Sequence, residues 1–144
     1  MDRFDFWWKW LVGVTLYLSV FGLVLAIFPQ ARIMDILFNN QIDPVFWPGG
    51  LLPEAAESFQ SWIYGVLGSV VAGWGIFMFF VVRYPFKAKE KWAWNCMAVA
   101  FTLWFVVDTI LSATHNAWFN VVFNTILWLL IVIPLLFTRK QFAT

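Results

Sequence analysis

The chain has 144 residues, of which 62% are hydrophobic and only 12% are charged, and its formal net charge is +1. Soluble domains carry about 25% charged residues, so this composition excludes a water-soluble globular protein. The near-neutral charge offers no extended basic surface for a phosphate backbone, which excludes nucleic acid as a partner.

Long charge-free runs predict membrane-spanning helices. A span needs about 20 apolar residues, because the hydrocarbon core is about 30 Å thick and a helix rises about 1.5 Å per residue. The run over residues 92–138 is too long for one helix and divides at the polar triplet Thr114–Asn116. We therefore expect an all-α, four-helix transmembrane bundle, one integral membrane domain over residues 1–144, with helices at about 7–28, 59–82, 92–113 and 117–137.

The distribution of Lys and Arg predicts the orientation of these helices. Eight of the nine lie in the N-terminal segment, in the loop between the second and third helices, and in the C-terminal tail. Only Arg32 lies in the long loop between the first and second helices. Short loops rich in these residues stay in the cytoplasm, so both termini are expected there, with the long loop on the outer side of the bilayer.

The long outer loop, residues 29–58, divides into three parts. Residues 31–38 are amphipathic and predict a short helix that lies in the membrane interface. Residues 39–50 are rich in Asn, Asp, Pro and Gly, which predicts turns. Pro53 is followed by Glu54 and Glu57, and because proline fits the first helical position and acids favour a helix N-terminus, the second helix is expected to begin near Pro53.

The second helix carries small residues at every fourth position. Helices in lipid associate through close contact, which small residues allow. We expect this row to be a packing surface inside the bundle, and contact between two copies of the chain is the alternative. The row consists of Ser61, Gly65, Ser69 and Gly73.

Asp108 is the one acid within a predicted span. An ionised carboxylate there costs at least about 2.5–3.5 kcal/mol, so such a group needs partners from the protein or from water. Ser112 and His115 lie within about 40° of Asp108 on an ideal helix. At about 1.5 Å per residue from the turn, Asp108 is about 10 Å deep and Asn124 on the next helix is about 13 Å deep. The candidate residues for ligand binding or proton transfer are Asp108, Ser112, His115, Asn120, Asn124, Tyr64 and Gln60.

This polar cluster allows three functional interpretations. The first is a non-enzymatic binding or accessory module, whose outward-facing polar pocket takes a small apolar or amphipathic molecule such as a lipid or a quinone. The second is a proton-coupled carrier or a redox-associated membrane enzyme in which Asp108 titrates. The third is a structural subunit of a larger membrane complex, whose 11 Trp residues and small-residue groove would contact partner helices. In a purely structural role, Asp108 would lock the bundle by bonding to Thr109, Asn124 or an indole.

The sequence contains no recognisable metal-binding, nucleotide-binding or hydrolase motif. One His and one Asp are too few for a protein zinc site, which needs three or four ligands, so no metal is expected. Nucleotide-binding and hydrolase motifs do not occur, and we therefore predict no cofactor and assign no catalytic residue.

Several segments carry a resemblance to a known group of proteins. They are Tyr64–Gly75 (YGVLGSVVAGWG), Pro85 with Phe86, Trp92–Trp94, Trp104–Thr109 (WFVVDT) and Phe119–Asn124 (FNVVFN). With these segments the chain resembles small uncharacterised bacterial inner-membrane proteins, and it is similar to the DoxX-like four-helix families. The resemblance covers the second to fourth helices and implies a four-helix bundle in a bacterial inner membrane. It supplies no substrate and no site residues.

Overall fold

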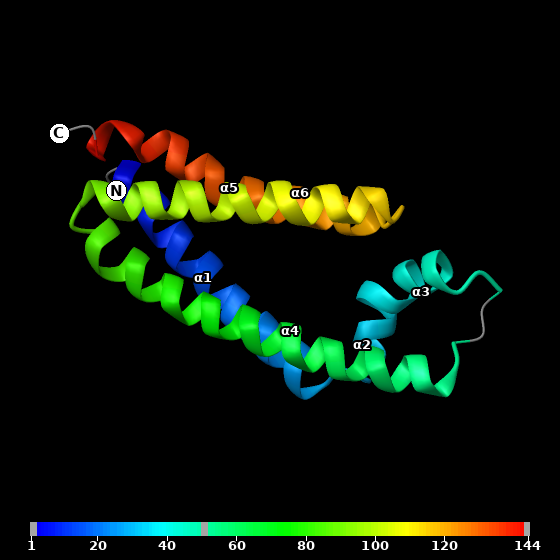
Figure 1. Cartoon of the computed structure of the whole chain (residues 1–144). Helices are drawn as coiled ribbons and strands as arrows, with labels where there is room; N and C mark the ends of the chain where they lie inside the picture. Colours follow the sequence, from blue (N-terminus) through cyan, green and yellow to red (C-terminus); the bar gives the residue numbers. More distant parts are fainter. Residues whose placement is uncertain (1–2, 50–51, 143–144) are drawn as a thin grey trace.

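The computed structural model describes residues 3–49 and 52–142, and all regular structure within them is helical. Four helices are long and apolar enough to cross a membrane, which confirms the all-α prediction with four candidate spans. They are α1 (Arg3–Ile27), α4 (Glu54–Val81), α5 (Lys91–Thr114) and α6 (Trp118–Thr138) (Figure 1). The shorter elements are α2 (Arg32–Met34), the π-helical turn η1 (Asp35–Asn39), α3 (Asn40–Phe46), the π-helical turn η2 (Val82–Phe86) and the 3-10 turn η3 (Arg139–Phe142).

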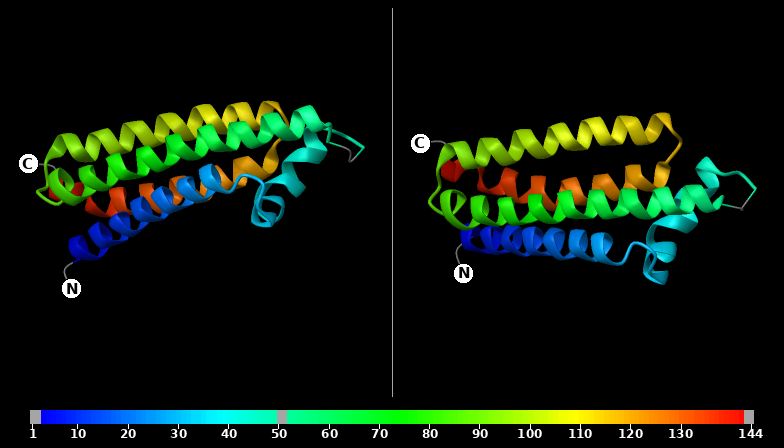
Figure 2. Two further views of the ribbon diagram at one scale, coloured as in Figure 1. Left: turned by 90° about the horizontal axis from the view of Figure 1, so that it is seen from below. Right: turned by 60° about the horizontal axis from the view of Figure 1, so that its bottom comes forward.

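The long helices form two pairs. α1 packs along α4, α5 packs along α6, and the pairs meet mainly where α1 contacts α6. Within the described residues, α4 has no comparable contact with α5. Figure 1 shows the pairs close together at the end that carries both termini and spread apart at the other end, and the right-hand view of Figure 2 shows α5 beside α6 and α4 beside α1.

Aromatic side chains close the end of the bundle at which the chain starts and finishes. Phe86 is fully buried there, with its ring 4.7 Å from that of Phe142 and 6.1 Å from that of Phe4 between centroids. These three rings come from η2, η3 and α1, so the cluster ties together segments far apart in the sequence. Buried aromatic groups pack with large contact areas, and this end is therefore the main core of the molecule.

Tryptophan indoles add hydrogen bonds between helices at the same end. Pro134 has no backbone N–H, so the carbonyl of Leu130 one turn earlier in α6 loses its helical donor. The indole of Trp10 on α1 donates to that carbonyl at 2.9 Å. Two further indoles bond to carbonyls on other segments, Trp8 to Val82 at 3.0 Å and Trp94 to Leu135 at 2.9 Å.

Glycines let α1 and α4 approach backbone to backbone. A Cβ atom added at Gly68 would collide with the backbone nitrogen of Ala26, and one added at Gly22 would collide with that of Ala72. A Cβ at Gly75 would lie 2.5 Å from the hydroxyl oxygen of Ser19. Such close contact is the usual means of helix association where lipid removes the hydrophobic driving force. We call this contact the α1–α4 seam.

The α1–α4 seam corrects the packing surface predicted for the second helix. Gly73 is exposed and a Cβ there would meet nothing within 4 Å, while Ser69 is also exposed. The seam uses the neighbouring row that contains Gly68 and Gly75, about 100° around the helix from Ser69. Spacing alone does not show which row of small residues faces the partner helix. The predicted row was Ser61, Gly65, Ser69 and Gly73, of which Gly65 lies at the edge of the seam.

Gly68→Ala should test the seam. The added methyl group has to push the two backbones apart, and we expect a loss of about 1–3 kcal/mol in the free energy of unfolding. Gly73→Ala is the matched control, because it makes the same change in the same helix where a Cβ meets open space. It should leave stability unchanged or raise it by up to about 1 kcal/mol through helix propensity. Thermal unfolding in detergent, followed by circular dichroism, measures both, and equal effects would contradict the seam.

Candidate functional site

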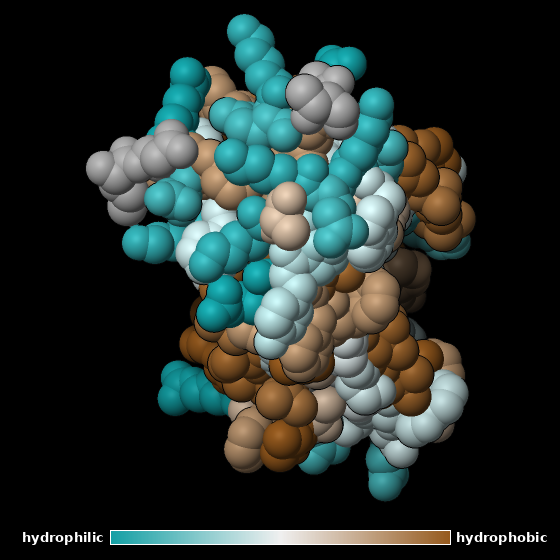
Figure 3. Space-filling model, turned by 90° about the vertical axis from the view of Figure 1, so that its left-hand side faces the viewer, coloured by the Kyte–Doolittle hydropathy of each residue, from teal (hydrophilic) through white to brown (hydrophobic). Residues whose placement is uncertain are grey.

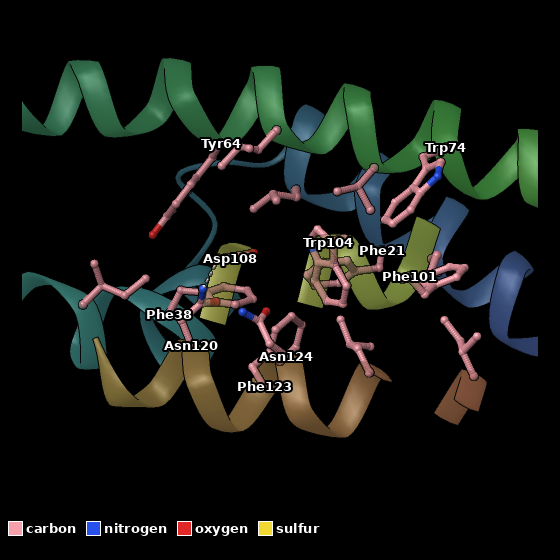
Figure 4. Close-up of a pocket in the computed structure, with 17 residues that line it drawn as sticks. Phe21, Phe38, Tyr64, Trp74, Phe101, Trp104, Asp108, Asn120, Phe123 and Asn124 are labelled. Carbon is pink, nitrogen blue, oxygen red and sulfur yellow. Dashed lines mark hydrogen bonds between the residues drawn. The ribbon is translucent and has the colours of Figure 1, made fainter. Parts of the chain in front are cut away.

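A cavity of about 460 Å³ lies between the two helix pairs, where they spread apart (Figure 4). All four long helices and the segment Arg32–Phe46 contribute to its walls. We call that segment the cap. The walls are mostly apolar, with Leu18, Phe21, Leu25, Phe38, Ile42, Leu67, Val71, Trp74, Phe101, Trp104, Phe123, Leu127 and Ile131.

Three aromatic side chains join α4 to α5 at the inner end of the cavity. Trp74 of α4 stacks on Phe101 of α5 with ring centroids 4.9 Å apart and planes inclined by 25°. Trp104 meets Trp74 edge to face at 6.1 Å. Side chains rather than backbones therefore bridge the space between these two helices, and the bridge limits the cavity toward the closed end of the bundle.

The cap covers the spread end of the bundle and inserts apolar residues into it. Met34 is 1% exposed, and the ring of Phe38 packs among those of Phe21 and Phe123 at 6.0 and 5.7 Å. Residues 32–39 are helical, as the amphipathic pattern predicts. Met34 and Phe38 face the protein, whereas Ile33, Ile36 and Leu37 stay exposed, so a position in the membrane interface remains a prediction. The turns predicted at residues 39–50 are wrong over Asn40–Phe46, which is helical, whereas residues 47–49 do form a turn and residue 50 lies outside the described residues.

Hydrogen bonds fasten the cap to α4. The Tyr64 hydroxyl donates to Asn39 Oδ1 at 2.7 Å, and Asn39 Nδ2 donates to Asp35 Oδ1 at 2.8 Å. One turn earlier in α4, Gln60 Nε2 donates to Asp43 Oδ1 at 2.6 Å. Of these two candidate residues, Tyr64 lines the cavity, whereas Gln60 holds the cap and is not part of the cavity wall.

One side of the cavity is polar, and α5 and α6 form it. Asn120 Nδ2 of α6 lies 3.1 Å from Asp108 Oδ1 and 2.8 Å from Ser112 Oγ, both of α5. Ser112 Oγ in turn bonds to the carbonyl oxygen of Asp108 at 2.7 Å and lies 3.2 Å from its Oδ1. We call Asp108, Ser112, Asn120 and Asn124 the polar patch. The structure thus brings the predicted α5 and α6 residues together across the turn.

Asn124 is the least satisfied member of the polar patch. Its side chain is 1% exposed, and its Nδ2 atom has no hydrogen-bond partner among residues 3–49 and 52–142. Figure 4 shows the amide beside Asn120 at the cavity wall. The bond from Asp108 to Asn124 or Thr109 that a purely structural role predicts does not form, and the Thr109 hydroxyl is likewise buried without a partner in the described chain.

His115 lies outside the cavity, which corrects its predicted place beside Asp108. Its ring is exposed, with Nδ1 2.8 Å from the carbonyl oxygen of Leu111 and the ring centroid 6.3 Å from that of Phe46. α5 ends at Thr114, and His115 has φ −98° and ψ 10°. The angle of about 100° per residue that placed His115 on the Asp108 face applies only inside a helix. A carboxylate–imidazole pair is therefore not built here.

The arrangement of these groups is suited to binding a small molecule. No group of three or more His, Cys, Asp or Glu side chains comes together within the described residues in a way that could hold a metal ion. The polar patch supplies one carboxylate with hydrogen-bond donors around it, and the remaining walls supply aromatic contact surface. Such a mainly apolar cavity with a few convergent polar groups is typical of small-molecule sites.

The sequence interpretation missed two parts of the site. Asp35, Asn39 and Asp43 follow one another at intervals of four, which places them on one helical face, and this spacing was the available signal for the cap. The aromatic bridge of Trp74, Phe101 and Trp104 left no such signal. Aromatic residues are frequent throughout this chain, so those that line a cavity do not differ in type from those that face lipid.

Comparison with known proteins gives no relative. No family model matches the chain, and no curated protein and no solved structure matches it. The resemblance to DoxX-like families therefore stays a prediction, and a function has to be argued from the cavity itself.

Tyr64→Phe should loosen the cap. The substitution removes the hydroxyl that bonds to Asn39 and keeps the ring, and a hydrogen bond of this kind contributes about 1 kcal/mol. We expect backbone amides of residues 32–46 to exchange hydrogen roughly fivefold faster, as measured by mass spectrometry. Tyr17→Phe is the control, since Tyr17 is 50% exposed on α1 and its ring stacks on Phe21 of the same helix. Unchanged exchange in Tyr64→Phe would contradict the tethering role.

Proposed function

We propose that this chain is a multi-pass protein of a bacterial inner membrane that binds a small apolar or amphipathic molecule in its cavity without transforming it. The observation that carries the proposal is the cavity of about 460 Å³, with aromatic and aliphatic walls and a single polar patch. Its size falls within the range of about 300–1,000 Å³ that is usual for small-molecule sites. The apolar walls suit a hydrocarbon or ring system, and the polar patch suits one polar end of the ligand.

The charge distribution supports a placement with both termini in the cytoplasm. Arg and Lys side chains gather where α1 and α5 begin and where η2 and η3 lie, and Figure 3 shows hydrophilic residues on this end of the molecule. The cap end has Arg32 together with the acids Asp35, Asp43, Glu54 and Glu57. By the positive-inside rule the first end faces the cytoplasm, which places the cavity in the outer half of the membrane.

The geometry of Asp108 favours binding over proton-coupled transport. A relay needs a second titratable group within hydrogen-bond reach, and His115, the candidate for it, lies outside the cavity. Asp108 instead accepts a hydrogen bond from the amide of Asn120 and contacts the hydroxyl of Ser112, neither of which titrates. The polar patch therefore suits a role in orienting a bound molecule.

Filling the cavity should abolish binding. Val71 of α4 lines the cavity, and Val71→Trp places a bulky indole inside it. Val70→Trp is the matched control, because Val70 is the adjacent residue and is 62% exposed on the outer surface. A medium-chain fatty alcohol that carries a diazirine serves as the probe, and mass spectrometry maps the residues that it labels on irradiation.

We expect the probe to label cavity-lining residues of α5 and α6 in the unchanged protein and in Val70→Trp. Labelling of those residues should fall at least tenfold in Val71→Trp, while labelling of the outer surface stays the same. Cavity labelling that survives in Val71→Trp, or labelling confined to lipid-facing residues in every variant, would refute the binding function.

A further inference from the structure

The cavity also indicates the chemical class of its ligand and the route by which the ligand enters. This inference rests on the binding function proposed above. We propose that the ligand is a neutral, hydroxyl-bearing lipid that enters from the bilayer through the gap between α4 and α5, with its hydroxyl group held by Asn124 and Asp108. Three observations support this proposal. They are the unused hydrogen-bonding groups of the polar patch, the exposed edge of the cavity, and the cavity volume.

Asn124 requires an acceptor. Its Nδ2 is buried without a partner in the described residues, although the residue lines the cavity. An unmet buried donor is destabilising, so native structures satisfy nearly all such groups. A ligand oxygen with a free lone pair would satisfy this one. The ligand therefore carries an oxygen acceptor at the polar patch.

Asp108 can accept a further donor. Both donors that reach its carboxylate, from Asn120 and Ser112, are directed at Oδ1, and within the described chain Oδ2 has no hydrogen-bond partner. An ionised carboxylate has about four lone-pair sites and accepts only. A ligand O–H or N–H would supply the missing bond. The ligand therefore also carries a donor close to its acceptor.

A hydroxyl group meets both requirements with one atom. It offers one O–H to Asp108 and two lone pairs, one of which can accept from Asn124. An ester or ketone oxygen has no proton to donate, and an ammonium group has no lone pair to accept. A phosphate or carboxylate would be repelled by Asp108 across a medium of low dielectric constant. The polar patch thus selects a neutral alcohol.

The cavity has an exposed edge between α4 and α5. Leu67 of α4 lines the cavity and yet is 50% exposed, which places it at the mouth. The cap with Phe38 covers the spread end of the bundle, and the ring of Trp74 against Phe101 closes the inner end. Figure 1 shows the ribbons of α4 and α5 diverging toward the cap end. In a bilayer this side faces acyl chains.

The volume points to a ligand with a tail. A cavity of about 460 Å³ holds roughly 15 groups of the size of a water molecule, at about 30 Å³ each. A polar head and the first part of a hydrocarbon chain fill this space, and the remainder of a longer chain can leave through the gap into the bilayer. A polar ligand from water would have to leave its hydration shell to pass the apolar mouth at Leu67, whereas a lipid would not.

The test uses the whole protein in phosphatidylcholine vesicles with two photoreactive probes. One is a fatty alcohol with a diazirine in its chain, and the other is the methyl ether of the same alcohol, which keeps the acceptor and loses the donor. We expect the alcohol to label the cavity about tenfold more than the ether, because a hydrogen bond to a charged group is lost. An excess of glycerol, which has hydroxyl groups and no tail, should not compete.

Asn124→Leu separates ligand recognition from a structural role. It replaces the amide by an apolar group of similar size, and alcohol labelling should fall about tenfold while the melting temperature stays the same or rises. Gln141→Leu is the matched control, because Gln141 also carries a buried side-chain atom without a partner in the described chain but lies outside the cavity. It should leave labelling unchanged. A lower melting temperature with unaltered labelling in Asn124→Leu would overturn the recognition role.

Leu67→Trp tests the route. Vesicles that contain the probe are mixed with the protein, and the rate at which cavity labelling appears is measured. Labelling should be severalfold slower in Leu67→Trp. Val66→Trp is the control, because Val66 is 41% exposed and does not line the cavity, and it should be labelled at the normal rate. If Tyr64→Phe, which loosens the cap, speeds labelling while Leu67→Trp does not slow it, the route lies under the cap and lateral entry is refuted.

The outcomes separate this inference from the proposed function. Equal cavity labelling by alcohol and ether, with both lost in Val71→Trp, would overturn the alcohol class and leave the binding function standing. Competition by glycerol would overturn the lipid assignment alone. Failure of both probes to label the cavity would remove the binding function itself.

Discussion

The backbone contact between α1 and α4 determines the shape of the whole bundle. Gly22 and Gly68 bring these helices closer than side chains would allow, so α4 follows α1 along its length. The hairpin of α5 and α6 follows a different direction, since its contact with the first pair is chiefly through α1 and α6. Close packing of one pair therefore leaves space next to the other. The cavity is a consequence of this unequal packing.

The two ends of the bundle are held by different interactions. At the end that carries the termini, the rings of Phe4, Phe86 and Phe142 fill the interior, and indoles bond to carbonyls on neighbouring helices. At the cap end the helices are held through a separate inserted segment, fastened by the side-chain bonds of Tyr64 and Gln60. One end is therefore held by a filled aromatic core, and the other by an inserted segment tied through two side-chain hydrogen bonds.

The polar patch combines two properties that are rarely found together in an apolar environment. Asn120 and Ser112 surround one oxygen of Asp108, which reduces the penalty of placing a carboxylate among apolar helices. At the same place Asn124 Nδ2 has no partner in the described chain, and the donors that reach the Asp108 carboxylate leave its second oxygen open. A purely structural lock would satisfy its members mutually. Capacity left open inside a cavity is the reason for assigning this patch to a ligand.

Composition and hydropathy determined the four long helices, because the thickness of a bilayer imposes a minimum length that can be counted along the chain. The start of α4 directly after Pro53 and the approach of polar residues of α6 to Asp108 were also predictable, since both result from local rules and from a short turn between adjacent helices. The depths along the helices paired Asp108 with Asn124, whereas the structure pairs it with Asn120. The face of α4 that meets α1, the place of His115 and the insertion of Phe38 were decided only by the tertiary structure. In a chain this apolar, residues that face lipid and residues that face protein are of the same types, so no periodicity distinguishes the two sides of a helix, and only the packed neighbours do.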